Sequence, residues 1–349
     1  ATDWNSNSDK VKAFMNCGQI MEINGLYYHL TDKGAVAVYY DGKESELVVN
    51  LPEEQEITFV CDGCFEDNKN LISVDLGTSV KEIGTKAFKN CEALQIARFG
   101  TKVEKIGANA FLECTELTET SMLQNIKVIG ESAFGGCAKL DFPEMNRNLQ
   151  SIGRSAFAAS GITDFECNKL EDGVIHMWAF SGCTKLETIV LNAEIEKLEY
   201  GAFSACTELV KVSLPKELKQ MDGSSFANCT KLEELNVPET LEKLDTLVFA
   251  RCTNLKKIII PETVKYIDRS CFEENRNLVV CFVASELPEG LTHGWDTTIK
   301  GYVLGYLGDK IVTDAENGFS YFITNDGIEV YAYAGMEAEL ELDTIDGYK

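Results

Sequence analysis

Apolar positions return along this chain every 23 residues. A phenylalanine occurs at each step from residue 65 to residue 272, with no insertion or deletion between the steps. The members of this column are Phe65, Phe88, Phe111, Phe134, Phe157, Phe180, Phe203, Phe226, Phe249 and Phe272. A constant period of this length is typical of repeat proteins in which each repeat forms one coil and buries its apolar face only against its neighbours. The spacing therefore predicts a solenoid of about ten coils over residues 57–285, with Phe88, Phe111 and Phe134 in a structural ladder along its core.

Each repeat contains two short apolar patterns that predict strands. The segment from Leu209 to Leu214 reads Leu-x-x-Val-x-Leu, and its end alternates apolar and polar residues as a half-buried strand does. Pro215 follows directly and ends the strand, because proline has a fixed φ and no N–H. A second apolar pair, Leu218 and Met221, indicates an extended segment on the opposite wall of the coil. The predicted architecture is a right-handed superhelix of short parallel strands with single helical turns.

The residue four positions before each phenylalanine marks the turn that carries the ring. Glycine stands there in early repeats and aspartate in late ones. These residues are Gly84, Gly107, Gly130 and Gly153, then Asp222, Asp245 and Asp268. We expect glycine to relieve a tight turn and aspartate to cap the helical turn.

One repeat, which begins at Phe157, departs from the pattern. Thr163 replaces leucine and Glu166 replaces valine at positions that are apolar elsewhere. The apolar set reappears displaced by about one residue, because the apolar positions there are Ile162, Phe165, Cys167 and Leu170. The sequence therefore predicts a local irregularity in this coil.

Both ends of the array carry segments that predict caps. Residues 1–56 hold an N-terminal segment and a β-hairpin, with strand patterns from Gly25 to Pro52 and a turn at Asp32-Lys33-Gly34. A solenoid needs such a cap, since its end coil would otherwise expose core side chains and an unpaired strand edge. The other end of the array, after residue 285, needs a cap for the same reason.

The last residues repeat the first hairpin. Residues 318–343 align without gaps on residues 25–50, so that Tyr321 matches Tyr28 and Gly327 matches Gly34. We therefore expect residues 313–349 to form a second hairpin of the same kind. Its position predicts either that the chain is a fragment of a longer protein with a second array, or that the hairpin is a vestige of one.

Seven of the 13 cysteines stand three residues after the repeat phenylalanine. They are Cys91, Cys114, Cys137, Cys183, Cys206, Cys229 and Cys252. Asn68, Ser160 and Asn275 fill the other places, which predicts buried thiols that donate a weak hydrogen bond to the turn. Disulfides are not expected, because single small polar residues would not replace paired cysteines and thiols on stacked coils point alongside one another. So many free thiols indicate a reducing or oxygen-poor setting, or thiols buried too deeply to react.

Composition limits the classes of partner. The chain has 349 residues, of which 45% are hydrophobic, and 56 acidic against 32 basic residues give a formal charge of −24. This charge repels phosphate backbones and anionic lipid headgroups, so neither nucleic acid nor a membrane surface is an expected partner. No apolar run approaches the roughly 20 residues of a membrane span, and no insertion is expected. Ala1 to Lys10 are polar, so an export signal was either removed or never present.

Residues able to do chemistry are scattered. His29, His176 and His293 fall in three different parts of the chain, too far apart for a metal cluster or a Cys–His pair. Cys61 and Cys64 form one Cys-x-x-Cys, but Cys64 lies in a column of small residues, which favours a structural role over a redox one. We therefore expect no enzyme activity, no metal site and no cofactor.

A binding surface is the better-supported hypothesis. The non-core positions of the predicted strands form two columns along one wall of the solenoid, and most of their residues are polar. Candidate partner anchors are the aromatic residues Phe142 and Phe165 and the apolar group Ile259, Val280 and Phe282. Coverage by the C-terminal cap is the alternative for the last three.

The repeat unit Ile-x-x-x-x-Ala-Phe-x-x-Cys-x-x-Leu-x-x-Val-x-Leu-Pro resembles the BspA-like, or treponemal-type, leucine-rich repeat. This resemblance covers all ten units and implies a leucine-rich repeat solenoid. It also implies that residues 286–312 form an irregular C-terminal cap, because the segment from Cys281 to Tyr306 resembles the cap that such arrays often carry. Members of that family are mostly surface or secreted proteins of host-associated anaerobic bacteria and some parasitic protists, with roles in adhesion and protein recognition. The resemblance transfers no binding residues, because the motif describes only the core.

The function we expect is therefore that of a non-enzymatic recognition module, secreted or at the cell surface. It would act as a monomer and bind a host or bacterial surface protein through the solenoid. The alternative is a structural stalk or spacer that displays another domain of a longer protein.

Overall fold

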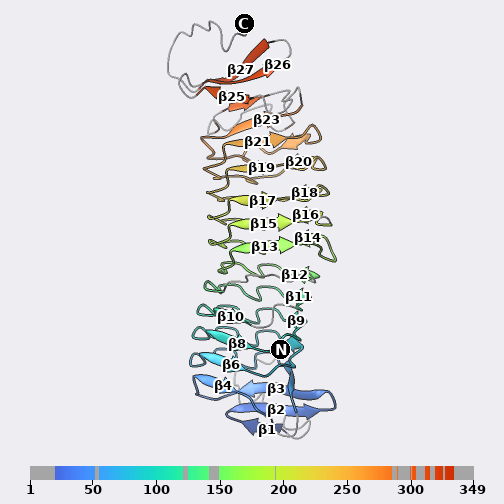
Figure 1. The fold of residues 1–349 in the computed structure, drawn as a ribbon, viewed down its shortest axis with the longest axis vertical. Coiled ribbons are helices and arrows are strands. Elements are labelled where there is room, and N and C mark those ends of the chain that lie inside the picture. The colour runs from blue at the N-terminus through green and yellow to red at the C-terminus, as the bar shows by residue number, and fades with distance from the viewer. Residues whose placement is uncertain are drawn as a thin grey trace, which may run out of the picture.

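The computed structural model describes the chain from residue 20 to residue 284, except for residues 52–54, 121–124, 141–148 and 193. Beyond residue 284 it describes residues 289 and 299 and the backbone of four strands. Coils stack along one axis into an elongated solenoid, as the sequence predicted (Figure 1). Each coil contributes to three walls, which we call the long-strand wall, the short-strand wall and the turn wall.

The long-strand wall contains the strand that follows each phenylalanine segment. Neighbouring strands pair in parallel, for example β6 with β8 through Val74 and Ala97. The strands of this wall are β4 (Glu46–Val48), β6 (Ser73–Asp75), β8 (Ile96–Arg98), β10 (Glu119–Thr120), β13 (Asp164–Cys167), β15 (Thr188–Leu191), β17 (Lys211–Ser213), β19 (Glu234–Asn236), β21 (Lys257–Ile260), β23 (Val279–Phe282) and β24 (Gly301–Val303).

The short-strand wall contains the second extended segment of each coil, which is only two residues long in most coils. These strands also pair in parallel, as the ladder from β7 through β9 to β11 does. They are β5 (Ile57–Val60), β7 (Glu82–Ile83), β9 (Lys105–Ile106), β11 (Val128–Ile129), β12 (Ser151–Ile152), β14 (Val174–Ile175), β16 (Lys197–Leu198), β18 (Gln220–Met221), β20 (Lys243–Leu244) and β22 (Tyr266–Ile267).

The turn wall carries the phenylalanines and differs from the helical turns that the sequence predicted. Around Phe88, the residues two before and two after it, Lys86 and Asn90, are left-handed, with φ of 57° and 58°. This alternation points every second N–H at the next coil instead of back along a helix. The N–H groups of Lys86, Phe88 and Asn90 donate to backbone carbonyls of the next coil at 2.8, 2.7 and 2.7 Å. The turn wall is therefore bonded from coil to coil as regularly as a sheet.

The phenylalanine ladder runs through the core as one column of stacked rings. Successive ring centroids lie 4.5 to 6.0 Å apart, and the ring planes differ by 3° to 13°. Such offset stacking adds to the area that each ring buries. Tyr40 of the N-terminal cap continues the column, with its centroid 5.2 Å from that of Phe65.

The cysteine column confirms the predicted thiol hydrogen bonds. Each Sγ donates to the carbonyl of the phenylalanine one coil earlier, as Cys114 does to Phe88 at 3.1 Å and Cys229 to Phe203 at 3.3 Å. Asn275 makes the same bond to Phe249 at 2.6 Å. The twelve cysteines within the described residues are all free thiols. A small donor at this place thus satisfies a carbonyl of the turn wall.

The glycine column has a different reason from the one expected. At Gly130 a Cβ would lie 2.6 Å from the backbone nitrogen of Ala108, and at Gly153 2.5 Å from that of Glu131. Neither glycine has a positive φ. Glycine is needed there because adjacent coils touch through their backbones, not because the turn is tight. Of the late aspartates, Asp268 makes the predicted cap, since its Oδ1 accepts the N–H of Ser270 at 2.9 Å, whereas Asp245 accepts only the adjacent backbone N–H, that of Thr246, at 2.9 Å.

The N-terminal cap is a three-stranded meander of β1 (Ile20–Ile23), β2 (Leu26–Thr31) and β3 (Gly34–Tyr40). It includes the predicted hairpin and adds β1 in front of it. β3 then pairs in parallel with β5, which joins the cap to the short-strand wall.

Near the C-terminus, β25 (Ile311–Asp314), β26 (Phe319–Thr324) and β27 (Gly327–Tyr333) repeat this meander (Figure 1). β26 pairs with β27 in the register of β2 with β3, and the irregularity between Ser320 and Tyr321 matches the one between Tyr27 and Tyr28. The gap-free alignment of the two segments is thus matched by the pairing of their backbones. The predicted domain boundaries around these segments stay predictions.

Candidate interaction surfaces

Outward-facing side chains of the long-strand wall were the predicted contact surface, and the strand register decides which residues these are. Phe165 of β13 pairs with Ile189 of β15, and Val280 of β23 pairs with Ile258 of β21. Both pairs depart by one residue from the spacing of the phenylalanine column. A shift of one residue turns every side chain of a strand to the other face of the sheet.

The predicted exposure of Phe165, Val280 and Phe282 is therefore wrong, because all three side chains are 0% exposed. The ring of Phe165 packs against Phe180 with the centroids 4.3 Å apart. Burying such a side chain is worth roughly 1.5 to 3 kcal/mol, which outweighs a constant strand spacing. The irregularity predicted for this coil is confirmed, since the displaced apolar residues are buried and Glu166 is exposed.

The other two predicted anchors have different outcomes. Ile259 of β21 is half-buried and pairs with Asn236 of β19 in the outward column, so it stays a candidate. Phe142 lies outside the described residues. In the shifted strand β13, Asp164 and Glu166 are exposed on the outer face.

A break in both strand walls was not predicted. One sheet of the long-strand wall ends at β17 and the next begins at β19, although every residue from 194 to 284 is described. On the short-strand wall the break falls at the same level, between β18 and β20. The turn wall stays bonded there, and Phe203 N–H donates to the carbonyl of Ser225 at 2.9 Å. The two blocks are thus joined by the turn wall and the core while their strand edges are unpaired.

A hollow of about 630 Å³ lies across the break on the long-strand wall. It is lined by Val210, Lys211, Val212, Glu233, Glu234, Leu235, Asn236, Lys256 and Lys257. Val210 is 50% exposed, and Val212 is only partly buried although Ile189 and Leu235, its neighbours in the inward column, are buried. Lys256 pairs with Glu233 at 3.0 Å beside these valines. At the break, Val210 and Val212 therefore form an apolar floor with a mixed-charge rim.

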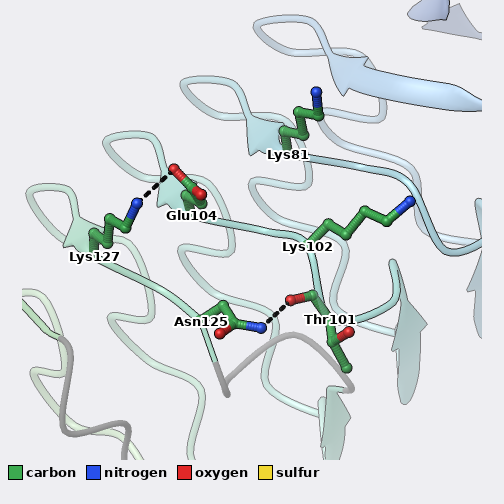
Figure 2. Close-up of a pocket in the computed structure, with 6 residues that line it drawn as sticks. All are labelled: Lys81, Thr101, Lys102, Glu104, Asn125 and Lys127. Atoms are coloured by element: carbon green, nitrogen blue, oxygen red, sulfur yellow. Dashed lines mark hydrogen bonds and ion pairs between the residues drawn. The ribbon is translucent and has the colours of Figure 1, made fainter.

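A second hollow, of about 420 Å³, is basic (Figure 2). Its lining is Lys81, Thr101, Lys102, Glu104, Asn125 and Lys127. Lys127 pairs with Glu104 at 2.9 Å, Lys102 donates to Ser79 Oγ at 3.0 Å, and Asn125 Nδ2 donates to the carbonyl of Thr101. Three ammonium groups and one carboxylate give this hollow a charge opposite to that of the whole chain.

Burial keeps the thiols protonated and lowers their reactivity. Desolvation raises the pKa of Cys91 and Cys252 to about 12, and that of Cys183 to about 11. The pKa of Cys206 is raised well above its ordinary value for the same reason. Because the thiolate is the nucleophile and the metal ligand, thiols held protonated in this way suit a structural role.

Among the described residues, no group of three His, Cys, Asp or Glu side chains could hold a metal ion. His176 stands between two carboxylates, with Nε2 3.0 Å from Asp172 and Nδ1 3.2 Å from Glu199. Within the same part of the chain, no helix has the length and apolar character to cross a membrane.

Comparison with known families identifies the repeats. Residues 43–163 and 162–279 match the family described as BspA type leucine rich repeat region (6 copies). A comparison with curated protein sequences finds no relative.

Among solved structures, the chain is similar to a leucine rich repeat protein of T. pallidum, TpLRR, at 23% identity and a TM-score of 0.45, over 61% of this chain and 91% of that one. It is also similar to a leucine rich cell surface protein of Faecalibacterium prausnitzii, at 19% identity and a TM-score of 0.37, over 83% and 99% of the two chains. The pneumococcal vaccine antigen PcpA is similar at 14% identity and a TM-score of 0.43, again over 83% and 99%.

Proposed function

Because the chain belongs to the BspA-type leucine-rich repeat family, we propose that it is a non-enzymatic recognition module that binds another protein through its long-strand wall. A solenoid of this kind presents a continuous wall on which a partner can lie. The family resemblance also supports a secreted or cell-surface location and a role in adhesion to a host or bacterial protein.

The observation that carries this proposal is the hollow at the break between β17 and β19. Protein interfaces bury an apolar centre inside a rim of polar residues, and a few central side chains supply most of the affinity. Val210 and Val212 provide such a centre, and the lysines and glutamates around them provide the rim. Ile259 lies on the same face, one strand beyond β19, and extends the apolar centre along the wall.

Val210, Val212 and the predicted anchor Ile259 take the place of the three predicted anchors that are buried. Phe165, Val280 and Phe282 are enclosed in the core and cannot contact a partner without unfolding their coil. Val210 is accessible because it lies just before β17 at a place that faces solvent in other coils too, as at Ile72 and Glu187.

Binding to an array of purified extracellular-matrix and serum proteins, followed by biolayer interferometry, tests this proposal. Val210→Ser should weaken binding to the captured partner by at least about tenfold, which is roughly 1.4 kcal/mol. Val48→Ser is a matched control, because Val48 is 52% exposed on β4 of the same wall, many coils away. Equal binding by both variants would contradict the assignment of this hollow.

A second candidate function, that of a stalk or spacer, is favoured by the elongated stack and by the meander at β25–β27 (Figure 1). A spacer would hold another domain at a distance and bind nothing with its long-strand wall. Failure of every protein on the array to bind the wild-type chain would favour this candidate.

A further inference from the structure

Two aromatic side chains stand exposed on the turn wall, away from the long-strand wall. Trp178 lies two residues before the ladder ring Phe180, and Tyr200 lies three before Phe203. The side chains are 41% and 43% exposed. Their rings meet edge to face, with centroids 6.2 Å apart and planes at 86°. The pair therefore forms one aromatic surface across two adjacent coils.

Trp178 occupies a backbone conformation that disfavours a large side chain. Its φ is 55°, in the left-handed region that costs an L-residue roughly 1 to 2 kcal/mol. Ser155 and Ser224 stand at the equivalent places of nearby coils with φ of 51° and 58°. The indole is not fully buried here, because Trp178 is 41% exposed, so it gains less from burial than a core side chain does. The same conformation recurs at Lys86 and Leu247, with φ of 57° and 58°, so it belongs to the turn wall, and the exposure of the indole is what sets Trp178 apart.

Two glycines make room for the rings. A Cβ on Gly201 would lie 2.6 Å from Cδ1 of Trp178, and one on Gly223 would lie 3.3 Å from Cε2 of Tyr200. Each ring therefore extends over the backbone of the next coil, where a larger residue would displace it. Ser224 Oγ donates to the Tyr200 hydroxyl at 3.3 Å, which helps to hold the second ring.

Fixed polar groups border the aromatic surface. Glu199 accepts the backbone N–H of Met177 at 3.0 Å and contacts Nδ1 of His176 at 3.2 Å. Asp172 contacts Nε2 of the same imidazole at 3.0 Å, and its side chain is 44% exposed. These carboxylates are held in place and keep lone pairs that can accept hydrogen bonds from hydroxyl groups.

We infer that Trp178 and Tyr200, with Asp172 and Glu199 beside them, form a site for a neutral sugar of a glycan chain. A sugar ring has a flat C–H face that packs on an indole, and its hydroxyls can donate to fixed carboxylates. This site lies on a different wall from the hollow proposed to bind protein, and it takes a different class of ligand.

Size and charge favour a sugar over other ligands. The exposed parts of two aromatic side chains amount to roughly 200 Å², far below the ~800 Å² that each partner contributes to a stable protein interface. A cationic ligand is disfavoured, because Arg154 Nη2 already lies 3.2 Å from Met177 Sδ and Lys197 pairs with Asp222 at 3.2 Å. Arg154 and Lys197 against Asp172, Glu199 and Asp222 leave a formal charge of only −1 on these side chains.

Saturation-transfer NMR and isothermal titration test this inference with cellohexaose, maltohexaose and the hexamer of N-acetylglucosamine as neutral probes. Heparin hexasaccharide serves as the anionic comparison. At least one neutral probe should bind the wild-type chain with a dissociation constant below about 10 mM, and its transfer signal should be strongest on ring C–H protons. Trp178→Ser and Tyr200→Thr should each weaken that binding by about tenfold or more.

These substitutions should leave the fold intact, so that a loss of binding reports on the site and not on unfolding. Ser155 and Ser224 stand at the equivalents of the first position one coil before and two coils after it, and Thr85 and Thr246 stand at the equivalents of the second. Tyr266→Thr is the matched control, because Tyr266 is 38% exposed on β22, away from the pair. Thermal unfolding of each variant checks that the array is intact.

Three outcomes would overturn the inference. One is no neutral probe bound at about 10 mM, a second is equal binding by the wild type and both aromatic variants, and a third is binding of heparin hexasaccharide alone. Capture of a purified protein that depends on Trp178 and Tyr200 would also overturn it, in favour of a protein site on this wall. Because Val210 lies on another wall, loss of sugar binding leaves the protein-binding proposal untouched, and the reverse also holds.

Discussion

Contact between rings of adjacent coils predicts an energetic coupling that can be measured. Phe111 and Phe134 are fully buried, and their rings stack at 5.3 Å with planes 4° apart. Changing either to leucine keeps most of the apolar volume and removes the stacking, which should cost about 1 to 2 kcal/mol. The first substitution already removes the stacking between the two rings, so the second substitution cannot remove it again. We therefore expect the double variant to be less destabilised than the sum of the single ones by about 0.5 to 1.5 kcal/mol.

Phe203 supplies the matched comparison. It is also fully buried in the ladder, but three phenylalanines separate it from Phe111 along the stack. Phe111→Leu combined with Phe203→Leu should therefore be additive within about 0.5 kcal/mol. Urea unfolding followed by circular dichroism gives the free energies, and a constant m-value shows that all variants unfold by the same transition. Equal coupling in the near and distant pairs would refute the idea that stabilisation passes from ring to ring.

Further predictions follow from the thiols and the glycines. A thiol whose pKa is about 12 in the folded chain and about 9 unfolded stabilises the fold fully below pH 9 and loses that contribution as the pH rises towards 12. Between pH 8 and pH 10, Cys91 and Cys252 should each lower the unfolding free energy by about 1.4 kcal/mol. Measured by urea unfolding, the free energy of the Cys91→Ser, Cys252→Ser double variant should therefore fall less over this pH range than that of the wild type. An equal fall in both proteins would contradict this. Gly130→Ala should destabilise the fold by about 3 kcal/mol, because the new Cβ would clash with backbone atoms of the adjacent coil. Gly77→Ala should cost only about 1 kcal/mol, because Gly77 has open space around it and the only cost comes from its φ of +83°. Thermal unfolding of both variants shows which substitution destabilises the fold more. A larger effect of Gly77→Ala would show that the spacing between coils can adjust to the added Cβ at Gly130.

The periodic part of the fold could be predicted from the sequence because one residue type reports one place in the coil. The phenylalanine column locates the core, and the mixture of cysteine and asparagine at the next column reveals a shared hydrogen bond. The helical turn was wrong in its detail, since two left-handed residues per turn leave no mark where lysine or glutamate fills them, as at Lys86 and Glu113.

The candidate surface was harder to predict, because exposure depends on the phase of each strand. Phe165 was assigned to solvent by counting from the phenylalanine column, although the displaced residues around it already indicated a shift. The break beside Val212 leaves no such sign, because the apolar column continues through Leu235. Two signals were available and missed. Asn24-Gly25 is a strong hairpin signal, and it predicts a strand, β1, before β2. Trp178 is a bulky residue in a column that holds serine in nearby coils.

The one-way bonding of the turn wall has an electrical consequence. In each coil alternate peptide groups accept from the coil before and donate to the coil after, so their dipoles of about 3.5 D point the same way. Dipoles of β-strands largely cancel, and nothing in the strand walls opposes this alignment. The backbone of the turn wall is thus electrically polarised along the solenoid axis, with its positive end towards the C-terminal coils.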